Sequence, residues 1–375
     1  SQVELVRFSW CDVHGILRGK VLTAQSAIKA VNDGLSMVST LMLKDTSDRT
    51  TYKVFEPDIE NVLPGFGYAN NLTLRPIPST WRILPWSQST GWVLCQPHFH
   101  DGSPVPYDTR TQLLKAIHRL EKFGFSMQCG LEVEFHIYKL VHSVLDAPLD
   151  PMQSNWPPPA PTVELIHPGY QLLSESLFDQ CEEPLRIVQN TAQALGLPLS
   201  SLEIELGPSQ VEAVFDLTDA LTAADNMVIF RNAVKQALRR SGYHATFMCR
   251  PPFPNIMSSG WHLHQSLLST ETNKNAFVRD ENRHDKVSPN KDFILSELGI
   301  HYLAGLLAHA RGAAAFCSAT ANSYARFRPN ALAPQLISWG HDNRGAMCRV
   351  IGPKGHPSTR IENRLGEPSA NPYLY

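Results

Sequence analysis

Two glutamates stand two residues apart in the segment GLEVEFHIY, which covers residues 130–138. Apolar and polar residues alternate along this segment, as they do in a β-strand with one buried face. Glu132 and Glu134 therefore fall on the same face, roughly 6.6 Å apart along the strand. Carboxylates held so close repel each other and their pKa values rise, unless a cation compensates their charge. The pair raises the question of what this face of the strand binds.

The same placing of polar residues on one strand face recurs in three further segments. SLEIELGPSQVEAVF contributes three glutamates, SGWHLHQSL two histidines, and TRIENRL a glutamate between two arginines. The residues are Glu203, Glu205, Glu212, His262, His264, Arg360, Glu362 and Arg364. A single strand of this kind most often faces solvent. Four of them, with Glu, His and Arg but without Lys, favour a common concave surface if the strands pair in one sheet.

The mixture of residue types indicates the chemistry of such a surface. Carboxylates in excess over imidazoles suit a hard divalent cation, Mg²⁺ or Mn²⁺. Arginine forks suit phosphate and carboxylate groups, and metal with arginine indicates phosphoryl transfer. The last quarter of the chain places six arginines within 40 residues: Arg326, Arg328, Arg344, Arg349, Arg360 and Arg364. There is no Walker loop and no GxGxxG motif, so we do not expect a P-loop or Rossmann site.

The elements that must position these residues predict an α+β fold, because helices alternate irregularly with hairpin-like strands. Residues 1–105 have the pattern of short strands and turns and open with a hairpin around His14-Gly15, so we place a domain boundary near residue 105. Beyond it, helical spacing and terminal glycines predict helices at 109–124, 182–196 and 222–242. Residues 155–161 are expected to form an extended connector and residues 269–292 a polar loop.

The bulk properties narrow the class of protein. The 375 residues carry 33 basic and 35 acidic side chains, which excludes the strongly basic balance of a nucleic-acid binder. The longest apolar stretch, residues 302–321, is interrupted by His309 and Arg311, so we expect a buried helix there and no membrane span. The start of the chain is too charged for a signal peptide, and the seven cysteines lack CxxC spacing. These features favour a cytoplasmic protein without nucleic-acid or membrane partners.

Six segments together resemble, in order, the signatures of the glutamine synthetase superfamily. They are LEVEF, ELGPSQVE, SGWHLHQSL, NSYARFRP, DNRGAMCRV and RIENRLGEPSANPYL. The resemblance runs from about residue 90 to the end of the chain. It implies a small N-terminal β-grasp domain at 1–105 and a catalytic domain with a curved antiparallel sheet at 106–375. Family members usually continue through further helices, so we expect this sequence to be truncated at its C-terminal end.

The resemblance also implies a role for each polar residue. Two ions, Mg²⁺ or Mn²⁺, would be bound by Glu134, Glu205 and Glu212 and by Glu132, His262 and Glu362, the second set beside the phosphates of ATP. His264, Ser266 and Arg360 would contact the nucleotide. Glutamate would be held by Arg326 and Arg364, and the transferred phosphoryl group would be stabilised by Arg344 and Arg349. We class Arg326, Arg344 and Arg349 as catalytic.

The family reaction has two steps: ATP phosphorylates the γ-carboxylate of glutamate, and an amine then displaces phosphate to form an amide. Its members form stacked rings with active sites between neighbouring subunits, which implies a homo-oligomer here. The expected partners are therefore glutamate, ATP, an amine and further copies of the same chain.

Three departures from the family pattern concern the amine and the amino acid. Leu332 replaces a flap glutamate that helps to deprotonate ammonium, Met257 and Ser258 replace an Asn-Gly pair near the amino end of glutamate, and residues 37–41 lack an ammonium-binding aspartate. SWGHDNR resembles the branch that forms γ-glutamylamines. We therefore predict a glutamate–amine ligase whose acceptor is an organic, in particular aromatic, amine. The alternatives are a catalytically silent structural relative and an ordinary glutamine synthetase, which Leu332 disfavours.

Overall fold

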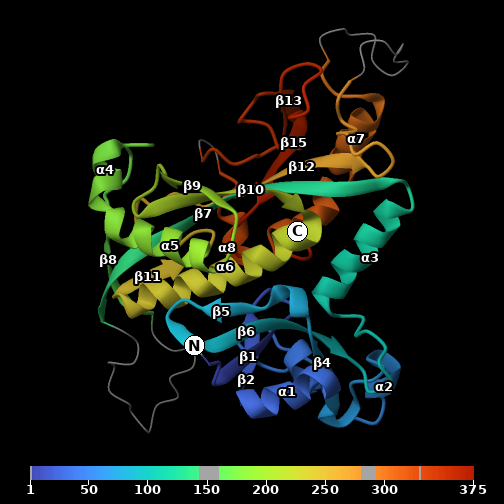
Figure 1. Cartoon of the computed structure of the whole chain (residues 1–375). Helices are drawn as coiled ribbons and strands as arrows, with labels where there is room; N and C mark the ends of the chain where they lie inside the picture. The colour runs from blue at the N-terminus through green and yellow to red at the C-terminus, as the bar shows by residue number, and fades with distance from the viewer. Residues whose placement is uncertain (1, 143–159, 280–292, 329–330) are drawn as a thin grey trace.

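The computed structural model describes residues 2–142, 160–279, 293–328 and 331–375. The described residues form a six-stranded and a nine-stranded sheet with helices packed against them. Figure 1 shows the smaller, N-terminal sheet below the larger one, with α3 (Thr109–Glu121) leading from one to the other. The predicted α+β class is confirmed. Residues 155–159 of the predicted connector lie outside the described residues, as do residues 280–292 of the predicted polar loop.

The N-terminal sheet has the strand order β2-β1-β6-β4-β3, with β5 paired to β6. Its strands are β1 (Leu5–Cys11), β2 (Leu17–Thr23), β3 (Leu35–Val38), β4 (Asn71–Pro76), β5 (Arg82–Leu84) and β6 (Ser87–His98). The predicted opening hairpin is confirmed, because β1 pairs antiparallel with β2. β1 also pairs parallel with β6, and α1 (Ala24–Asp33) packs on this sheet. The β-grasp topology and the domain boundary near residue 105 stay predictions.

The larger sheet places the polar strands side by side. Its order is β13-β14-β15-β12-β7-β10-β9, with β8 and β11 also paired to β7. The strands are β7 (Phe125–His142), β8 (Thr162–Leu165), β9 (Leu199–Ile204), β10 (Gln210–Asp219), β11 (Tyr243–Thr246), β12 (Trp261–Ser269), β13 (Trp339–His341), β14 (Cys348–Ile351) and β15 (Arg360–Gly366). All pairs are antiparallel except the edge pair β13–β14. The expectation that the polar-faced strands belong to one sheet is therefore confirmed.

Helices cover the apolar face of the larger sheet and leave the opposite face for the polar residues (Figure 1). The predicted helices are present as α3, α5 (Glu182–Ala194) and α6 (Ala220–Arg240), and α4 (Glu175–Gln180) precedes α5. On β7, Phe135 stacks on the ring of Phe247 and meets the ring of Phe230 edge-to-face, and all three are buried. Burial of each such ring stabilises the fold by about 1.5–3 kcal/mol. This core fixes the sheet whose other face carries the glutamates.

The C-terminal segment after β15 ties the two sheets together. Arg231 of α6 is buried and donates hydrogen bonds to the carbonyl oxygens of Pro368, Ala370 and Gly15, at 2.9, 2.8 and 3.2 Å. The Asn371 amide donates to the carbonyl oxygens of residues 12 and 13, at 3.3 and 3.2 Å. The turn of the N-terminal hairpin is thereby joined to the end of the strand that carries Glu362.

The apolar stretch near residue 310 forms α7 (Glu297–Cys317), and α8 (Ala321–Tyr324) follows it. The prediction that this helix is buried is wrong. Of its residues only Gly299, Leu303, Ala310 and Cys317 are buried, because one narrow side packs on β14 and β15 while the rest lies at the surface. In the part of the chain that the structure describes, no helix is long and apolar enough to cross a membrane. All seven cysteines are buried and unpaired.

Candidate active site

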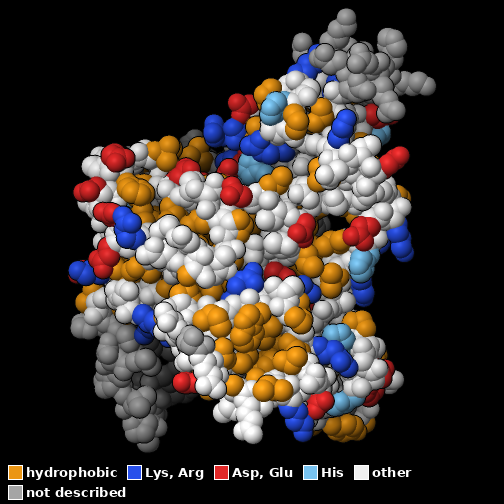
Figure 2. All heavy atoms as spheres, viewed as in Figure 1, with side chains coloured by type: hydrophobic (Ala, Val, Ile, Leu, Met, Phe, Trp, Pro, Cys, Tyr) orange, Lys and Arg blue, Asp and Glu red, His pale blue; other side chains and the backbone are white. Residues whose placement is uncertain are grey.

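The register of the larger sheet brings the polar residues of neighbouring strands opposite one another. The facing pairs are Glu134–Glu212, Glu212–Glu203, Glu132–His262 and His264–Glu362. Alternation along each strand puts these side chains on the sheet face that α5 and α6 do not cover. Figure 2 shows acidic, basic and histidine side chains gathered over this part of the molecule, whereas a hydrophobic patch lies over the N-terminal sheet. The pairing fixes which side chains can share an ion.

These side chains surround a cavity of about 580 Å³. The predicted site residues that line it are Glu132, Glu134, Glu205, Glu212, Ser258, His262, Arg326, Leu332, Arg344, Arg349 and Arg364. The other predicted residues, His264, Ser266, Arg360 and Glu362, lie on β12 and β15 next to it. The structure therefore brings the residues chosen from the sequence to one place. Their individual roles stay predictions.

Glu134, Glu205 and Glu212 form the first candidate metal cluster, because one carboxylate oxygen of each lies within 4.8 Å of the others. Burial, reinforced by the charge of Glu205, raises the pKa of Glu134 to about 8. Burial, reinforced by the charge of Glu134, raises the pKa of Glu212 to about 10. Burial also raises the pKa of Glu205. Since a divalent cation would remove this unfavourable crowding, the three carboxylates fit a hard metal ion.

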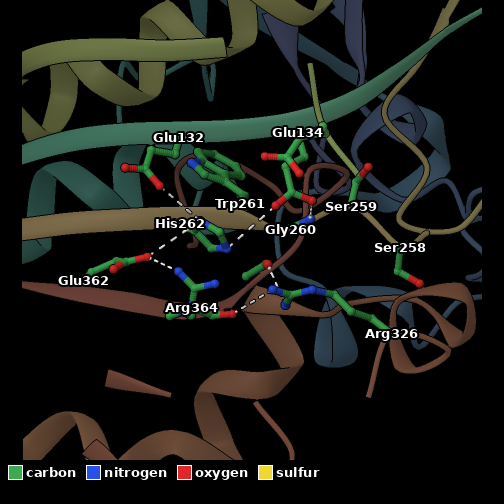
Figure 3. A network of polar contacts seen from close by, with 12 residues as sticks. Glu132, Glu134, Ser258, Ser259, Gly260, Trp261, His262, Arg326, Glu362 and Arg364 are labelled. Carbon is green, nitrogen blue, oxygen red and sulfur yellow. Dashed lines mark hydrogen bonds and ion pairs between the residues drawn. The ribbon is translucent and has the colours of Figure 1, made fainter. Parts of the chain in front are cut away.

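His262 lies at the centre of the second group of ligand atoms (Figure 3). Its Nδ1 is 3.2 Å from Glu132 Oε2 and 3.6 Å from Glu362 Oε1, and its Nε2 is 3.9 Å from Glu134 Oε1. Burial lowers the pKa of His262 to about 4, so its ring is neutral near pH 7 and can offer a lone pair to a metal. The three residues predicted to bind the second ion therefore lie together.

His264 lies nearer to the metal ligands than its predicted nucleotide role requires. Its Nε2 is 2.9 Å from Glu132 Oε1, and it forms a candidate cluster with Glu132 and Glu362. Burial alone would raise the pKa of Glu132, but hydrogen bonds from His262 and His264 outweigh burial and lower it. Arg360 Nε donates to Nδ1 of His264 at 2.9 Å. His264 and Arg360 thus form one unit at the edge of the second group.

Two arginines hold the fully buried Glu362. Arg349 Nη1 donates to Glu362 Oε2 at 3.0 Å. Arg364 Nη1 donates to Glu362 Oε1, a contact that Figure 3 shows. Arg349 Nε also donates to Asp342 Oδ1 at 3.0 Å. Burial alone would raise the pKa of Glu362, but His262 and Arg364 outweigh burial and lower it. The guanidinium groups are therefore placed beside the metal ligands, where an anionic phosphoryl group needs compensating charge.

Arg326 is buried and fixes the end of β15 through main-chain contacts. It donates to the carbonyl oxygens of Arg364, Leu365 and Gly366 at 3.0, 3.2 and 3.0 Å (Figure 3). A Cβ on Gly260 would lie 2.7 Å from Arg326 Nη2, so a side chain at position 260 would require this guanidinium to shift away from its carbonyl partners. Arg326 therefore orders the strand of Glu362 and Arg364 as well as lining the cavity.

Three further predicted residues occupy different depths of the site. Arg344 is exposed at the rim of the cavity, whereas Ser266 is buried on β12. The Ser258 hydroxyl accepts a hydrogen bond from Arg250 Nη1 at 3.2 Å. Of these, Arg344 is the one most free to move toward a bound phosphoryl group.

The sequence analysis did not identify Gln210, whose amide on β10 donates a hydrogen bond to the carboxylate of Glu134. Its Nε2 donates to Glu134 Oε2 at 3.0 Å, and Gly260 N donates to the same oxygen at 2.7 Å. Its Oε1 accepts from Gly207 N at 2.9 Å, and the residue is buried. Both hydrogen bonds engage Oε2, so Oε1 of Glu134 is left for an ion. The available signal was its position two residues before Glu212 on the same face of β10.

Sequence reasoning also missed the apolar rim of the cavity. Leu172 and Leu173 line it beside Leu332, and all three are exposed. Leu173 and Leu332 have φ of +56° and +55°, a conformation that costs a non-glycine residue roughly 1–2 kcal/mol. Glu203, which the sequence marks only as part of a polar face, lines the same cavity. A Leu-Leu pair in a sequence gives no indication of whether its side chains lie at the rim of a cavity or in the hydrophobic core.

A comparison with protein families decides the relationship. The family model described as the catalytic domain of glutamine synthetase matches residues 106–375. The chain belongs to the glutamine synthetase family. The resemblance drawn from six sequence segments is confirmed.

Curated relatives and solved structures agree with this assignment. Gamma-glutamylanilide synthase from Acinetobacter sp is 37% identical over 385 residues, which cover 100% of this chain and 73% of that protein. Glutamine synthetase from Methanosarcina mazei is 33% identical, with 99% of this chain and 73% of that protein covered. A GmaS/ADP complex superposes with a TM-score of 0.76 at 26% identity, covering 99% of this chain and 75% of that one. The glutamine synthetase-type fold and the likeness to the γ-glutamylamide branch are thereby shown.

The family relationship supports an ATP-dependent glutamate ligase that uses divalent metal ions. The donor set of this chain fits such ions, because the candidate clusters combine carboxylates with imidazole. The chemistry of the amine acceptor is a separate matter, which depends on the rim of the cavity.

Proposed function

We propose that this protein joins the γ-carboxylate of glutamate to an organic amine, preferably a neutral aromatic amine, through a γ-glutamyl phosphate intermediate. The observation that carries the proposal is one cavity with carboxylates, imidazole and arginines at its base and Leu332 at its rim. A relative at 37% identity that is named gamma-glutamylanilide synthase supports an aromatic acceptor.

In the first step, an oxygen of the γ-carboxylate attacks the γ-phosphorus of ATP, and ADP leaves. The two groups of ligands would hold divalent ions, which would supply positive charge to the phosphate oxygens. Arg344, exposed at the rim, presents a planar fork that matches the oxygens of the transferred group, and Arg349, whose guanidinium is held by Glu362 and Asp342, adds positive charge beside it. Arg364 and Arg326 are proposed to hold the carboxylates of glutamate, while His264, Ser266 and Arg360 contact the nucleotide.

In the second step, the amine nitrogen attacks the carbonyl carbon of the glutamyl phosphate; the C–N bond forms, the C–O bond to phosphate breaks, and the proton lost by the nitrogen passes to the leaving phosphate or to solvent. Ammonium and alkylamines are largely protonated near pH 7 and cannot attack until a base removes a proton. Leu332 cannot act as that base or attract a cation, but it offers apolar surface to a ring. An arylamine is already neutral and needs less help. Its chemistry therefore matches a cavity with a leucine at this position.

The proposal is tested by measuring kcat/KM for ammonium, an alkylamine and aniline between pH 6 and 9, with product identified by mass. We expect aniline to be the best acceptor near neutral pH, and Leu332→Glu to shift the preference toward ammonium. If ammonium is the best acceptor of the wild-type protein, the acceptor assignment is wrong. If Leu332→Glu changes nothing, position 332 does not set the preference.

We also propose that the protein works in the cytoplasm as a homo-oligomer of stacked rings, as the family resemblance implies. Sedimentation of the purified protein tests the proposed oligomeric state. A monomer that is fully active would contradict the expectation that neighbouring subunits share a site.

A further inference from the structure

The loop at residues 168–174 has an unusual backbone for its sequence. Gly169, Tyr170 and Leu173 have φ of +77°, +62° and +56°, although two of them carry large side chains. Leucine rarely adopts this left-handed conformation, and neither Leu172 nor Leu173 is placed in the core by it. Their exposed fractions are 54% and 61%. The backbone is therefore bent in a way that leaves two large apolar side chains at the surface.

Main-chain hydrogen bonds hold this loop against β9. Tyr170 N donates to the carbonyl oxygen of Leu206 at 2.6 Å, and Leu173 N donates to that of Ile204 at 3.0 Å. The Tyr170 hydroxyl donates to the carbonyl oxygen of Asn255 at 2.5 Å. These bonds fasten the loop at Tyr170, before the leucine pair, and at Leu173, the second member of the pair. The two leucines thus stand beside the strand that carries Glu203.

Leu332 adds a third apolar side chain to the same cavity. It is 67% exposed and has φ of +55°, so its backbone also turns a leucine out of the core. Leu172, Leu173 and Leu332 all line the cavity that holds the carboxylate clusters. Exposed leucines gathered around a polar cavity suit a ligand that has one apolar and one polar end.

Glu203 is a polar residue of this cavity that has no proposed role in binding the metal ions. It lines the cavity and lies opposite Glu212, yet it belongs to none of the three candidate metal clusters formed by the described residues. Its carboxylate accepts one hydrogen bond from Ser201 Oγ at 2.9 Å. Because an ionised carboxylate has capacity for several donors, it can accept a hydrogen bond from an N–H group of a ligand.

We propose that Leu172, Leu173 and Leu332 form the apolar wall of the acceptor subsite, and that Glu203 accepts a hydrogen bond from the amine nitrogen. The ligand class is a primary arylamine, whose ring contacts the leucines while its N–H points to the carboxylate. This inference rests on the proposed function, since it assumes that an amine attacks a glutamyl phosphate in this cavity. It assigns the choice of amine to a loop that lies far in sequence from position 332.

The test combines substitutions that suit the backbone with a measurement that does not involve the amine. Asparagine tolerates positive φ, so the double variant Leu172→Asn/Leu173→Asn removes the apolar wall and keeps the loop. The matched control is Leu165→Asn, a 52% exposed leucine that lines a neighbouring cavity. Formation of glutamyl phosphate is followed by glutamate-dependent oxygen-isotope exchange in ATP without amine. The amide-forming step is followed as kcat/KM for aniline and for methylamine.

We expect the double variant to retain isotope exchange within twofold, to raise KM for aniline at least tenfold and to change KM for methylamine little. Glu203→Gln should lower kcat/KM for aniline about tenfold and leave Mn²⁺ affinity unchanged, whereas Glu164→Gln, at an exposed glutamate, should change neither. An unchanged KM for aniline in the double variant would refute the proposal that the leucines form the apolar wall of the acceptor subsite. A loss of Mn²⁺ affinity in Glu203→Gln would show that Glu203 is a metal ligand and would refute its proposed role as the acceptor of a hydrogen bond from the amine.

Two further results separate this inference from its premise. If the wild-type protein shows no glutamate-dependent exchange and forms no γ-glutamylanilide, the proposed function and the subsite fall together. If it forms the anilide but the leucine variants alter only the sedimentation of the oligomer, the leucines contact another subunit and the subsite alone is wrong.

Discussion

Replacing Gln210 with methionine should weaken metal binding at the cluster of Glu134, Glu205 and Glu212. Glu134 Oε2 accepts two hydrogen bonds, from Gln210 Nε2 at 3.0 Å and from Gly260 N at 2.7 Å, and the substitution removes the first. A hydrogen bond to a charged group contributes about 1.5–3 kcal/mol, and about 1.4 kcal/mol corresponds to a factor of ten. We therefore expect the Kd for Mn²⁺ to rise about 10- to 100-fold, as is typical when a partner of a metal ligand is lost.

Gln210→Met should also reduce the free energy of unfolding. Gly207 N donates a hydrogen bond to Gln210 Oε1 at 2.9 Å, and this N–H group would lose its partner. A buried group left unsatisfied costs about 1–3 kcal/mol, and Tm would fall accordingly. Stability and metal affinity must therefore be separated. Gln265→Met is the control, since Gln265 is another buried amide, whose Oε1 accepts from the Tyr302 hydroxyl at 2.5 Å.

Free Mn²⁺ is measured by electron paramagnetic resonance during titration of each folded variant, and Tm is measured by calorimetry. The control should lose stability without losing Mn²⁺ affinity, whereas Gln210→Met should lose both. A Gln210→Met protein that binds Mn²⁺ as tightly as the wild type would refute the argument that this amide orients Glu134. An equal loss of Mn²⁺ affinity in both variants would show that the effect comes from a general loss of sheet stability and not from the contact between Gln210 and Glu134.

Two other predictions concern charge. Because burial raises the pKa of Glu134 from 4.5 to about 8, this carboxyl group binds more protons in the metal-free folded protein than in the unfolded chain within this range. The contribution of Glu134 to the free energy of unfolding should therefore fall as pH rises through that window, and Mn²⁺ should raise Tm more at pH 8 than at pH 6; an equal shift at both pH values would contradict this. Arg344→Lys should lower kcat about 100-fold, because a point charge lacks the fork that matches a phosphoryl group, and near-normal turnover would show that Arg344 plays no part in transfer.

Alternation along single strands makes the ligand-bearing faces predictable from the sequence alone. The pairs at 132 and 134 and at 262 and 264 must each share a face, whatever the tertiary fold. The neighbours of those strands could be placed only through the family resemblance. In the folded chain β7 lies between β10 and β12, which is why Glu132 meets His262 while Glu134 meets Glu212.

Other features of the site depend on contacts that no local pattern encodes. Gln210 supports Glu134 because β10 pairs with β7 in one register, and a shift of one residue would turn its amide to the opposite face. Arg326 was expected to face a substrate, but three of its contacts are carbonyl oxygens of β15, about forty residues further along the chain. Leu173 and Leu332 could not be expected at positive φ, since leucine carries no signal for that conformation.

The link between the C-terminal segment and the first hairpin has a consequence for how the chain can vary. Arg231 and Asn371 contact that hairpin through the carbonyl oxygens of residues 12, 13 and 15, and every residue type supplies a carbonyl oxygen. The contacts with the C-terminal segment therefore constrain the backbone path of the turn rather than its side chains, although the buried Asp12 carboxylate also holds that path by accepting hydrogen bonds from His14 N and Ile16 N at 3.0 and 2.9 Å. Gly15 is the exception, because φ is +79° and a Cβ there would lie 3.1 Å from the Cα of Asn371. A chimera that takes residues 1–105 from a relative should thus dock correctly only if it keeps this glycine, Asp12 and the apolar side chains that enter the core of the larger sheet, such as Leu84 and Trp92.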